Sequence, residues 1–519
     1  MLLVMAIIGL WNLDRLPIAW NDEVQNLDPA LVWHNTGIFC SPLWPNPGAD
    51  IKFLSYPPLI EAWHCLWLFF GKSVWIVRLP FLIAHLLTGL LLYRGLLSLL
   101  KNQENHTFWA FFLTALFLFD KSTGEIARSL RVETPILLLL ALVLPLLNQY
   151  FTLQTTRGAV IIGTLLGCLT LAHLYTWPVV ATALILAVLA AKTNKQNMKS
   201  LLMVLTFSLP IGIFWAMLSP EIHDLKSQLL MQTADHSSHA IKENLIQFFW
   251  GRFFPYSLEQ PYTPVFHALY FVLSFQLLHF YKTSFTHTAT ALTKAWIPLI
   301  YLSLSLPMML LVAPQHRYYP IQHFLGLLVV ADAIVCLGIH KKIERIGSAF
   351  YNKLGSYKRL FSGIFTAILV GMILFPYTIR HSAAAWHRTQ RNPNTAIAFL
   401  NKNLNPVPAG EILGEPIADY WLAQSPNRKH WRFGFEFYPQ HFPYSPQVPR
   451  YFLSRVAPNQ LPFLSIVDSL QIPATPWQKK LSLPAVGHTY NGLYLYRIPS
   501  RAGWDSLIQP AMLRVTSGH

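Results

Sequence analysis

The chain has 519 residues, of which 53% are hydrophobic and only 12% are charged, and its formal net charge is +16. An ordinary soluble domain carries roughly 25% charged residues, so this composition excludes a wholly soluble protein and indicates a membrane protein with soluble material added. The basic residues cluster in short loops between apolar runs, which favours a role in membrane topology over binding of nucleic acid.

Apolar runs recur along the first three quarters of the chain. A helix needs about 20 apolar residues to cross roughly 30 Å of hydrocarbon. We divide the stretch 158–191 near His173, where polarity rises, and a single strongly tilted helix is the competing interpretation. The pattern predicts about eleven transmembrane helices, at 1–13, 74–100, 107–119, 134–151, 158–173, 176–191, 200–218, 263–281, 294–313, 319–339 and 359–379.

The loops between these runs carry an orientation signal. With the N-terminus in the cytoplasm, the inside loops hold many lysines and arginines, above all the cluster between Lys341 and Arg359. We therefore expect the first long loop and the C-terminal part to share the outer face. The segments predicted on that face are 14–73, 120–133, 219–262, 314–318 and 380–519.

Residues 380–519 differ in character from the rest, because no apolar run there is long enough to span a membrane. Asn392-Pro393 predicts the start of a helix over 394–403. Strands are expected at 411–414, 464–467 and 492–498. The sequence thus predicts a mainly α, polytopic membrane protein, with a membrane domain at 1–379 and an extracytoplasmic α/β domain at 380–519.

The four cysteines, Cys40, Cys65, Cys168 and Cys336, lack the spacing of metal ligands. Cys168 and Cys336 fall in apolar runs and are expected to be small core residues. Cys40 and Cys65 share the first loop, where a disulfide would form only if the loop faces an oxidising space.

An acidic pair, Asp22 and Glu23, follows the first apolar run directly. Carboxylates beside a membrane are energetically costly and often functional. One carboxylate is suited to act as general base on an acceptor hydroxyl or amine, and a second can hold a cation or orient the acceptor. The alternative is that the pair stabilises the start of a helix over 24–33, since acidic residues favour helix N-termini.

Further polar residues lie at the predicted outer ends of spans. Arg131 has the planar fork that suits phosphate, although an internal ion pair with Glu133 explains it equally well. Arg317 and Tyr318 occupy a short outer turn, where they suit a lipid phosphate or an aromatic belt with a snorkelling arginine. Asp332 is isolated inside an apolar run and is expected to hydrogen-bond a neighbouring helix.

The end of the first loop predicts an amphipathic helix. Pro57 and Pro58 pre-set a first helical turn, and the following residues, 60–70, are rich in Trp and Phe. Such a helix suits the membrane interface, where it would border the entrance for a lipid tail. An ordinary amphipathic connector has the same composition.

Together, these short motifs resemble those of a known family. The acidic pair, Pro57-Pro58-Leu59 and Arg78-Leu79-Pro80 look like the multi-spanning glycosyltransferases of the dolichyl-phosphate-mannose–protein mannosyltransferase superfamily, which includes the bacterial lipid A aminoarabinose transferases. Arg131-Val132-Glu133 and Arg317-Tyr318-Tyr319 resemble two further motifs of that group. The likeness covers the layout of roughly residues 1–340.

One departure concerns the residue before the two prolines. Many members of the superfamily have a basic residue there, whereas this chain has Tyr56. Lys52 lies four positions earlier and is the candidate replacement. The details of contact with a donor phosphate depend on this difference.

The resemblance implies a multi-pass protein of the bacterial inner membrane that moves a sugar, with inversion, from a polyprenyl-phosphate donor to a lipid, glycan or protein acceptor on the outer face. Asp22 would be the general base. Glu23 and Glu133 would position donor or acceptor, or hold a divalent cation, which is the only cofactor implied. The donor phosphate would be contacted by Arg131, Arg317 and Tyr318.

Two other functions remain open from the residues: a transporter or flippase of lipid-linked sugars, and a non-catalytic envelope protein that binds glycan. Apart from Asp332, the spans lack the membrane-centre charges that transporters show, which disfavours the first. No Walker loop and no nucleotide-binding glycine-rich turn is present in the sequence, so a cytosolic nucleotide donor has no support.

Overall fold

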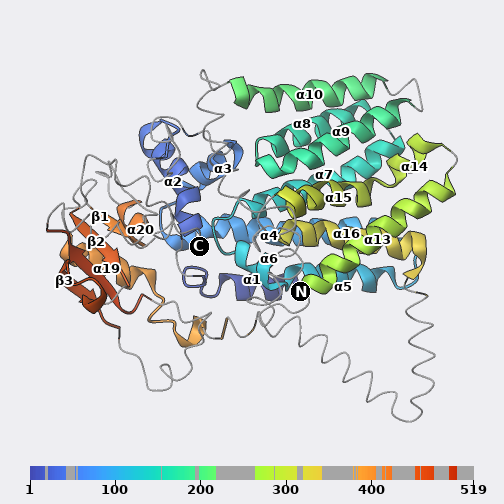
Figure 1. Cartoon of the computed structure of the whole chain (residues 1–519). Coiled ribbons are helices and arrows are strands. Elements are labelled where there is room, and N and C mark those ends of the chain that lie inside the picture. The colour runs from blue at the N-terminus through green and yellow to red at the C-terminus, as the bar shows by residue number, and fades with distance from the viewer. Residues whose placement is uncertain are drawn as a thin grey trace, which may run out of the picture.

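The computed structural model is mainly helical and carries a small sheet towards the C-terminus (Figure 1). The structure describes part of the chain. That part comprises residues 1–17, 21–41, 53, 57–153, 155–192, 198–217, 263–285, 287–311, 319–339, 341, 378, 381–382, 384–404, 412–414, 417–423, 450–455, 458–472 and 490–499.

The longer helices form a bundle in which they run roughly along one direction (Figure 1). Its members are α1 (Leu2–Leu10), α4 (Val74–Leu100), α5 (His106–Leu118), α7 (Glu133–Leu153), α8 (Thr156–Thr170), α9 (Trp177–Lys192), α10 (Met198–Met217), α13 (Thr263–Ser284), α15 (Trp296–Leu311) and α16 (Tyr319–Leu337). Two short helices, α6 (Lys121–Ile126) and α14 (Thr288–Lys294), join them.

Several of these helices are suited to a membrane. By length and composition, four stretches could cross one: Val74–Leu100, Glu133–Tyr150, Leu174–Ala191 and Tyr319–Leu337. Shorter apolar helices lie at His106–Leu118, Thr156–Thr170, Met198–Leu209 and Trp296–Met308. The fold is thus that of a polytopic membrane protein, while the number eleven stays a prediction and the expected span 359–379 lies outside the described residues.

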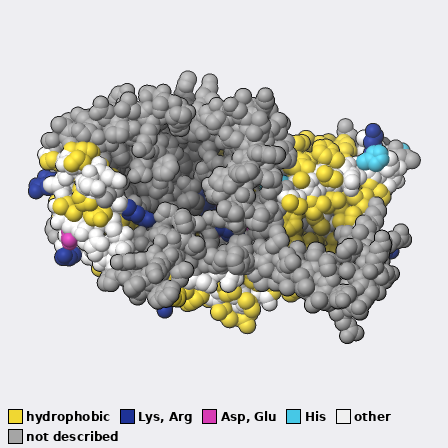
Figure 2. All heavy atoms as spheres, turned by 60° about the horizontal axis from the view of Figure 1, so that its bottom comes forward, with side chains coloured by type: hydrophobic (Ala, Val, Ile, Leu, Met, Phe, Trp, Pro, Cys, Tyr) yellow, Lys and Arg dark blue, Asp and Glu magenta, His cyan; other side chains and the backbone are white. Residues whose placement is uncertain are grey.

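The surface of the bundle supports this assignment. On α13, Val265, Leu269, Val272 and Phe275 are all exposed and recur at helical spacing along one stripe. Figure 2 shows broad areas of hydrophobic side chains on the described part of the face that it presents. Exposed apolar stripes are unfavourable in water and favourable against lipid.

The division of 158–191 into two helices is confirmed. α8 ends at Thr170, a short 3-10 turn η1 (Leu174–Thr176) follows, and α9 begins at Trp177. Nδ1 of His173 accepts a hydrogen bond from the backbone N–H of Tyr175 at 3.3 Å, so the polar residue caps the new turn. The alternative of one continuous tilted helix is wrong.

The first long loop contains two helices, α2 (Asn21–Thr36) and α3 (Leu59–Leu68). α3 begins directly after Pro57-Pro58, as the sequence predicts. The acidic pair lies in the first turn of α2. No disulfide joins Cys40 and Cys65, so the pairing considered from the sequence is not formed. Cys168 and Cys336 are free and half-buried.

The C-terminal part forms a four-stranded sheet with two helices, α19 (Pro393–Asn403) and α20 (Ile417–Ala423). The strand order is β1-β2-β4-β3, with β1 and β2 parallel and the other pairs antiparallel. The expected helix and three strands are present, whereas β2 and α20 were not predicted. The strands are β1 (Ile412–Gly414), β2 (Tyr451–Ser454), β3 (Ser465–Leu470) and β4 (Leu493–Arg497).

This C-terminal part shares a hydrophobic core with the first loop. Buried residues of α2 and of the first turns of α4 pack in one cluster with α19, α20 and β4; they include Leu27, Val77, Phe81, Leu400, Trp421 and Leu495. The loop and the sheet therefore lie at the same end of the bundle, as the count of loops predicts (Figure 1). The boundary at 379/380 lies outside the described residues and stays a prediction.

Candidate active site

The end of the bundle where α4 begins is called the Asp22 end here; it comprises α2, α3, the start of α4 and residues 120–133. Asp22 lies in the first turn of α2, and its side chain is outside the described part. One turn later, the buried Asn26 donates from Nδ2 to the carbonyl oxygen of Leu130 at 2.9 Å. The start of α2 is thus held against the segment that contains Arg131.

Glu23 forms a buried bidentate ion pair with Arg78. The two carboxylate oxygens accept from Nε and Nη2 of Arg78, each at 2.6 Å, and both side chains are 0% exposed. Nη1 of the same guanidinium donates to the carbonyl oxygens of Leu13 and Pro17 at 2.9 and 2.7 Å. Arg78 therefore joins α4 to α2 and to the segment just before Asp22.

Arg131 and Glu133 form a second buried bidentate pair. Nε and Nη2 of Arg131 lie 3.0 and 2.6 Å from the carboxylate oxygens of Glu133, with the side chains 4% and 0% exposed. This is the internal ion pair that the sequence left open as the alternative to phosphate binding. Glu133 is also the first residue of α7, where a negative charge is stabilised by the helix dipole.

Arg128 organises the chain that leads into α2. Its guanidinium donates to four backbone carbonyl oxygens, at 2.7 to 3.2 Å, and lies 3.0 Å from Nδ1 of His381. The carbonyls belong to Ile8, Trp11, Asn12 and Leu16. These hydrogen bonds satisfy carbonyl oxygens of α1 and of the irregular segment after it, as buried backbone polar groups require.

A small cleft opens between this loop and α6. It is lined by Leu16, Pro17, Lys121, Gly124, Glu125, Arg128 and His381. Lys121 and Arg128 are buried basic residues beside the segment that precedes Asp22, His381 lies against the Arg128 guanidinium, and Glu125 lines the same cleft. An anion such as a phosphate would be attracted to this part of the Asp22 end.

α3 contributes two buried ionisable side chains, Glu61 and His64, that are 0% and 3% exposed. Desolvation raises the pKa of Glu61 to about 8. Desolvation lowers the pKa of His64 to about 4, and its contact with the Asn26 carbonyl oxygen acts in the opposite direction. Burial thus disfavours the charged form of both groups.

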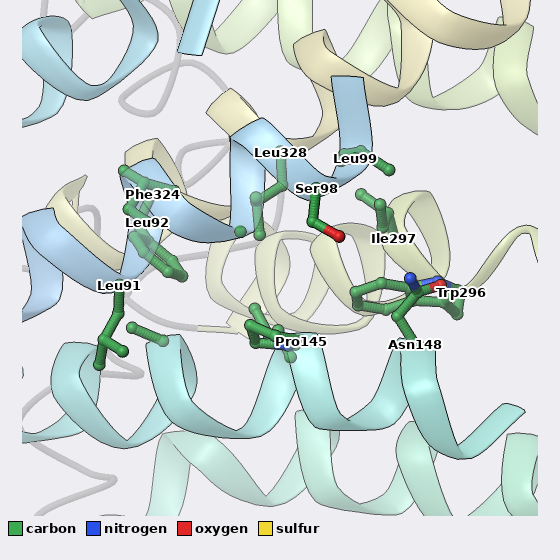
Figure 3. Close-up of a pocket in the computed structure, with 13 residues that line it drawn as sticks. Leu91, Leu92, Ser98, Leu99, Pro145, Asn148, Trp296, Ile297, Phe324 and Leu328 are labelled. Carbon is green, nitrogen blue, oxygen red and sulfur yellow. The ribbon is translucent and has the colours of Figure 1, made fainter. Parts of the chain in front are cut away.

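A second, more apolar pocket lies between α4, α7, α15 and α16 (Figure 3). Among its described lining residues, Ser98 and Asn148 bring polar side chains to walls that are otherwise largely apolar. Gly95, at its edge, is 17 positions after Arg78 along α4, which corresponds to about 25 Å at 1.5 Å per residue. This pocket is thus separate from the Asp22 end.

The expected site residues have different outcomes. The structure brings Glu23, Arg131 and Glu133 to one end of the bundle, together with the first turn of α2. Lys52, Tyr56, Arg317 and Tyr318 lie outside the described residues, so their roles stay predictions. Asp332 accepts from the hydroxyl of Tyr281 at 2.8 Å, which confirms the expected bond between helices.

Sequence reasoning missed Arg128, Lys121 and His381, because Arg128 contacts distant backbone carbonyls and His381, 253 positions along the chain, and Lys121 joins them only in the folded cleft. The available signal was weak: Arg128 lies in the same short polar segment as Arg131. Glu61 and His64 were read only as part of an amphipathic pattern. Their spacing of three residues on a helix, with both on one face, was the signal that could have identified them.

The fold was compared with those of known proteins. No protein-family model and no curated protein matches the chain by sequence. Among solved structures, ArnT from Cupriavidus metallidurans matches in its apo state with a TM-score of 0.51 and 11% identity, covering 95% of this chain and 96% of that one. The same protein bound to undecaprenyl phosphate gives 0.52 and 12%, with coverages of 96% and 97%.

The archaeal oligosaccharyltransferase AglB from Archaeoglobus fulgidus, in complex with an inhibitory peptide and a dolichol-phosphate, is more distant. It matches with a TM-score of 0.45 and 12% identity, over 87% of this chain and 68% of that chain. The ArnT match extends over nearly the whole of both chains. The resemblance to the multi-spanning glycosyltransferases is thereby confirmed at the level of the fold.

Proposed function

We propose that this protein is a membrane glycosyltransferase that moves a sugar from a polyprenyl-phosphate donor to a lipid, glycan or protein acceptor of the cell envelope. Asp22 is the general base that takes the proton from the acceptor nucleophile. Attack on the face opposite the leaving phosphate inverts the anomeric carbon. The reaction takes place on the outer face of a bacterial inner membrane, where the loop count puts the Asp22 end and the C-terminal sheet.

The observation that carries the proposal is the buried anchoring of the first turn of α2 at one end of an ArnT-like bundle. Arg78 forms an ion pair with Glu23, and Asn26 donates a hydrogen bond to the carbonyl oxygen of Leu130. Arg128 donates hydrogen bonds to the backbone of the segment that precedes α2. A general base must be fixed within hydrogen-bond reach of the proton it removes, and such anchoring fixes the backbone that bears Asp22. Polyprenyl phosphates suit this chain because undecaprenyl phosphate is the ligand bound to the ArnT structure with the same fold.

The ion pairs refine the roles of the acidic and basic residues. Both oxygens of Glu23 contact Arg78, so we assign Glu23 as a positioning residue beside Asp22. Arg131 and Glu133 hold the facing segment in the same way. Lys121, in the neighbouring cleft, adds positive charge that would stabilise the departing polyprenyl phosphate, with Arg317 and Tyr318 as further candidates for this contact.

The test uses purified protein in lipid discs, supplied with radiolabelled polyprenyl-phosphate sugars and envelope extract, and follows release of the sugar. Asp22→Asn should lower turnover by ~10² or more while donor binding persists, because the amide keeps the size but not the basicity. The matched control is Asp14→Asn, another acidic residue of the same loop, which should retain activity. Equal turnover of wild type and Asp22→Asn would refute the base, and donor binding without release by any form would refute the transferase.

A further inference from the structure

Glu61 and His64 are two buried polar side chains that have no role in the proposed reaction. They lie three residues apart on α3, which puts them on one face with about 5–6 Å between their Cβ atoms. Both side chains are shielded from solvent, at 0% and 3% exposure. Within the described part of the chain, neither carboxylate oxygen of Glu61 has a hydrogen-bond partner, and Nε2 of His64 also has none.

The other buried acids at this end show how unusual Glu61 is. Glu23 and Glu133 each receive two hydrogen bonds from an arginine. A buried carboxylate without such a partner loses its hydration and gains nothing in return. Glu61 therefore has to hold a proton or a cation that the amino-acid side chains described here do not supply.

The orientation of His64 distinguishes between these two possibilities. Its Nδ1 lies 3.2 Å from the carbonyl oxygen of Asn26, which can only accept, so Nδ1 carries the proton. The lone pair is then on Nε2, the buried nitrogen without a partner. A metal-binding histidine typically donates its other ring N–H to a backbone carbonyl in this way. A proton on Glu61 alone would leave Nε2 of His64 without a partner, whereas a metal ion would satisfy both groups.

We propose that Glu61 and His64 bind a divalent transition-metal ion, through the Glu61 carboxylate and Nε2 of His64. The spacing Glu-x-x-His on a helix is one that carboxylate-rich metal bundles use to present both ligands on one face. Because no group of three or more His, Cys, Asp or Glu residues lies close enough together among the described residues, the site has two protein ligands there. An imidazole beside a carboxylate favours Zn²⁺ or Mn²⁺ over Mg²⁺.

This site differs from the one that the family resemblance implies for a cation. Glu23 and Glu133 were the expected cation ligands, but the oxygens of both are occupied by arginines. Glu61 and His64 lie on α3, which packs against α2 and α4. A metal ion bound there would tie α3 more firmly to α2 through the hydrogen bond from His64 to Asn26.

The experiment measures thermal unfolding of chelator-treated protein in lipid discs while Zn²⁺ alone is added. For wild type, the melting temperature should rise and saturate, and Mg²⁺ at the same concentrations should give little shift. Glu61→Gln and His64→Gln should each weaken the apparent affinity for Zn²⁺ at least ~10-fold, the loss typical of damage to a metal site. The control is Asp332→Asn, which should bind Zn²⁺ like wild type. Asp332 is also a buried carboxylate, and one of its oxygens lacks a hydrogen-bond partner.

Two outcomes would overturn the proposal. One is a wild-type protein whose melting temperature does not change and which retains no radioactive zinc after gel filtration. The other is a zinc-induced shift that is unchanged in both Glu61→Gln and His64→Gln. Folding is checked without metal, where Glu61→Gln should melt close to the wild-type temperature, because it keeps the size of the side chain and replaces one buried polar group without a partner by another.

Discussion

The ion pair between Glu23 and Arg78 gives the sharpest quantitative prediction. Both side chains are fully buried and two hydrogen bonds of 2.6 Å join them. Removing one partner of a buried pair typically costs about 3–5 kcal/mol, because the other charge stays buried without compensation. Glu23→Gln keeps one acceptor oxygen and similar size, so we expect the lower limit, about 3 kcal/mol. At 1.4 kcal/mol per tenfold change, this is roughly a hundredfold increase in local opening.

Hydrogen exchange measured by mass spectrometry on protein in lipid discs reports this opening. Peptides from the start of α2 and the start of α4 should exchange about a hundredfold faster in Glu23→Gln, whereas α8 and α10 should not change. Asp14→Asn is the control, since Asp14 contacts Arg15 at 3.4 Å with both side chains partly exposed. Such exposed pairs contribute about 0–1 kcal/mol, so the control should change exchange only a few-fold.

An equally small effect of Glu23→Gln and Asp14→Asn on α2 would contradict a stabilising role of the buried pair. In that case the start of α2 would be held by its apolar contacts and by Asn26, and the buried pair would contribute no more than a surface pair. A large effect confined to α4 would also count against it, because Arg78 is expected to hold two segments together.

Two further predictions concern the bundle and the loop before α2. Gly326→Ala places a methyl group against the ring of Tyr270, and such overpacking should destabilise the protein by about 1–3 kcal/mol and lower its melting temperature. The control is Gly95→Ala, whose Cβ would contact only Pro145, at 3.7 Å, and which should be neutral or stabilising. Arg128→Lys replaces three donating nitrogens with one ammonium and so removes hydrogen bonds to the backbone. Each lost hydrogen bond from a charged donor costs about 1.5–3 kcal/mol. Hydrogen exchange of the backbone amides of residues 8–17 should therefore become at least ~10-fold faster. Unchanged exchange there would show that the loop is held by other contacts.

The sequence predicted most helices because their signals are local. Apolar runs fix the positions of helices such as α4, and Pro57-Pro58 and Asn392-Pro393 mark helix starts that the structure contains. β2 was missed for a related reason. Its four residues, Tyr451–Ser454, have too little pattern of their own, and the strand exists because β1 and β4 pair with it on either side.

The candidate site could be predicted only in part. The sequence indicated that Asp22, Glu23, Arg131 and Glu133 lie near one face of the membrane, since loop position follows from the order of the spans. It left open whether each charge binds substrate or another residue of the chain. The structure answers this for the pairs with described side chains, and the short family motifs alone could not.

The sequence by itself determined where the apolar helices lie, that the long first loop and the C-terminal part belong to the same side, and that a carboxylate pair opens α2. Each follows from composition or order along the chain. The tertiary structure decided which charges meet: Glu23 with Arg78, 55 positions away, and Arg128 with carbonyls more than 100 positions away. Burial is the physical reason, because a charge removed from water must find a partner in space, however distant that partner is in sequence.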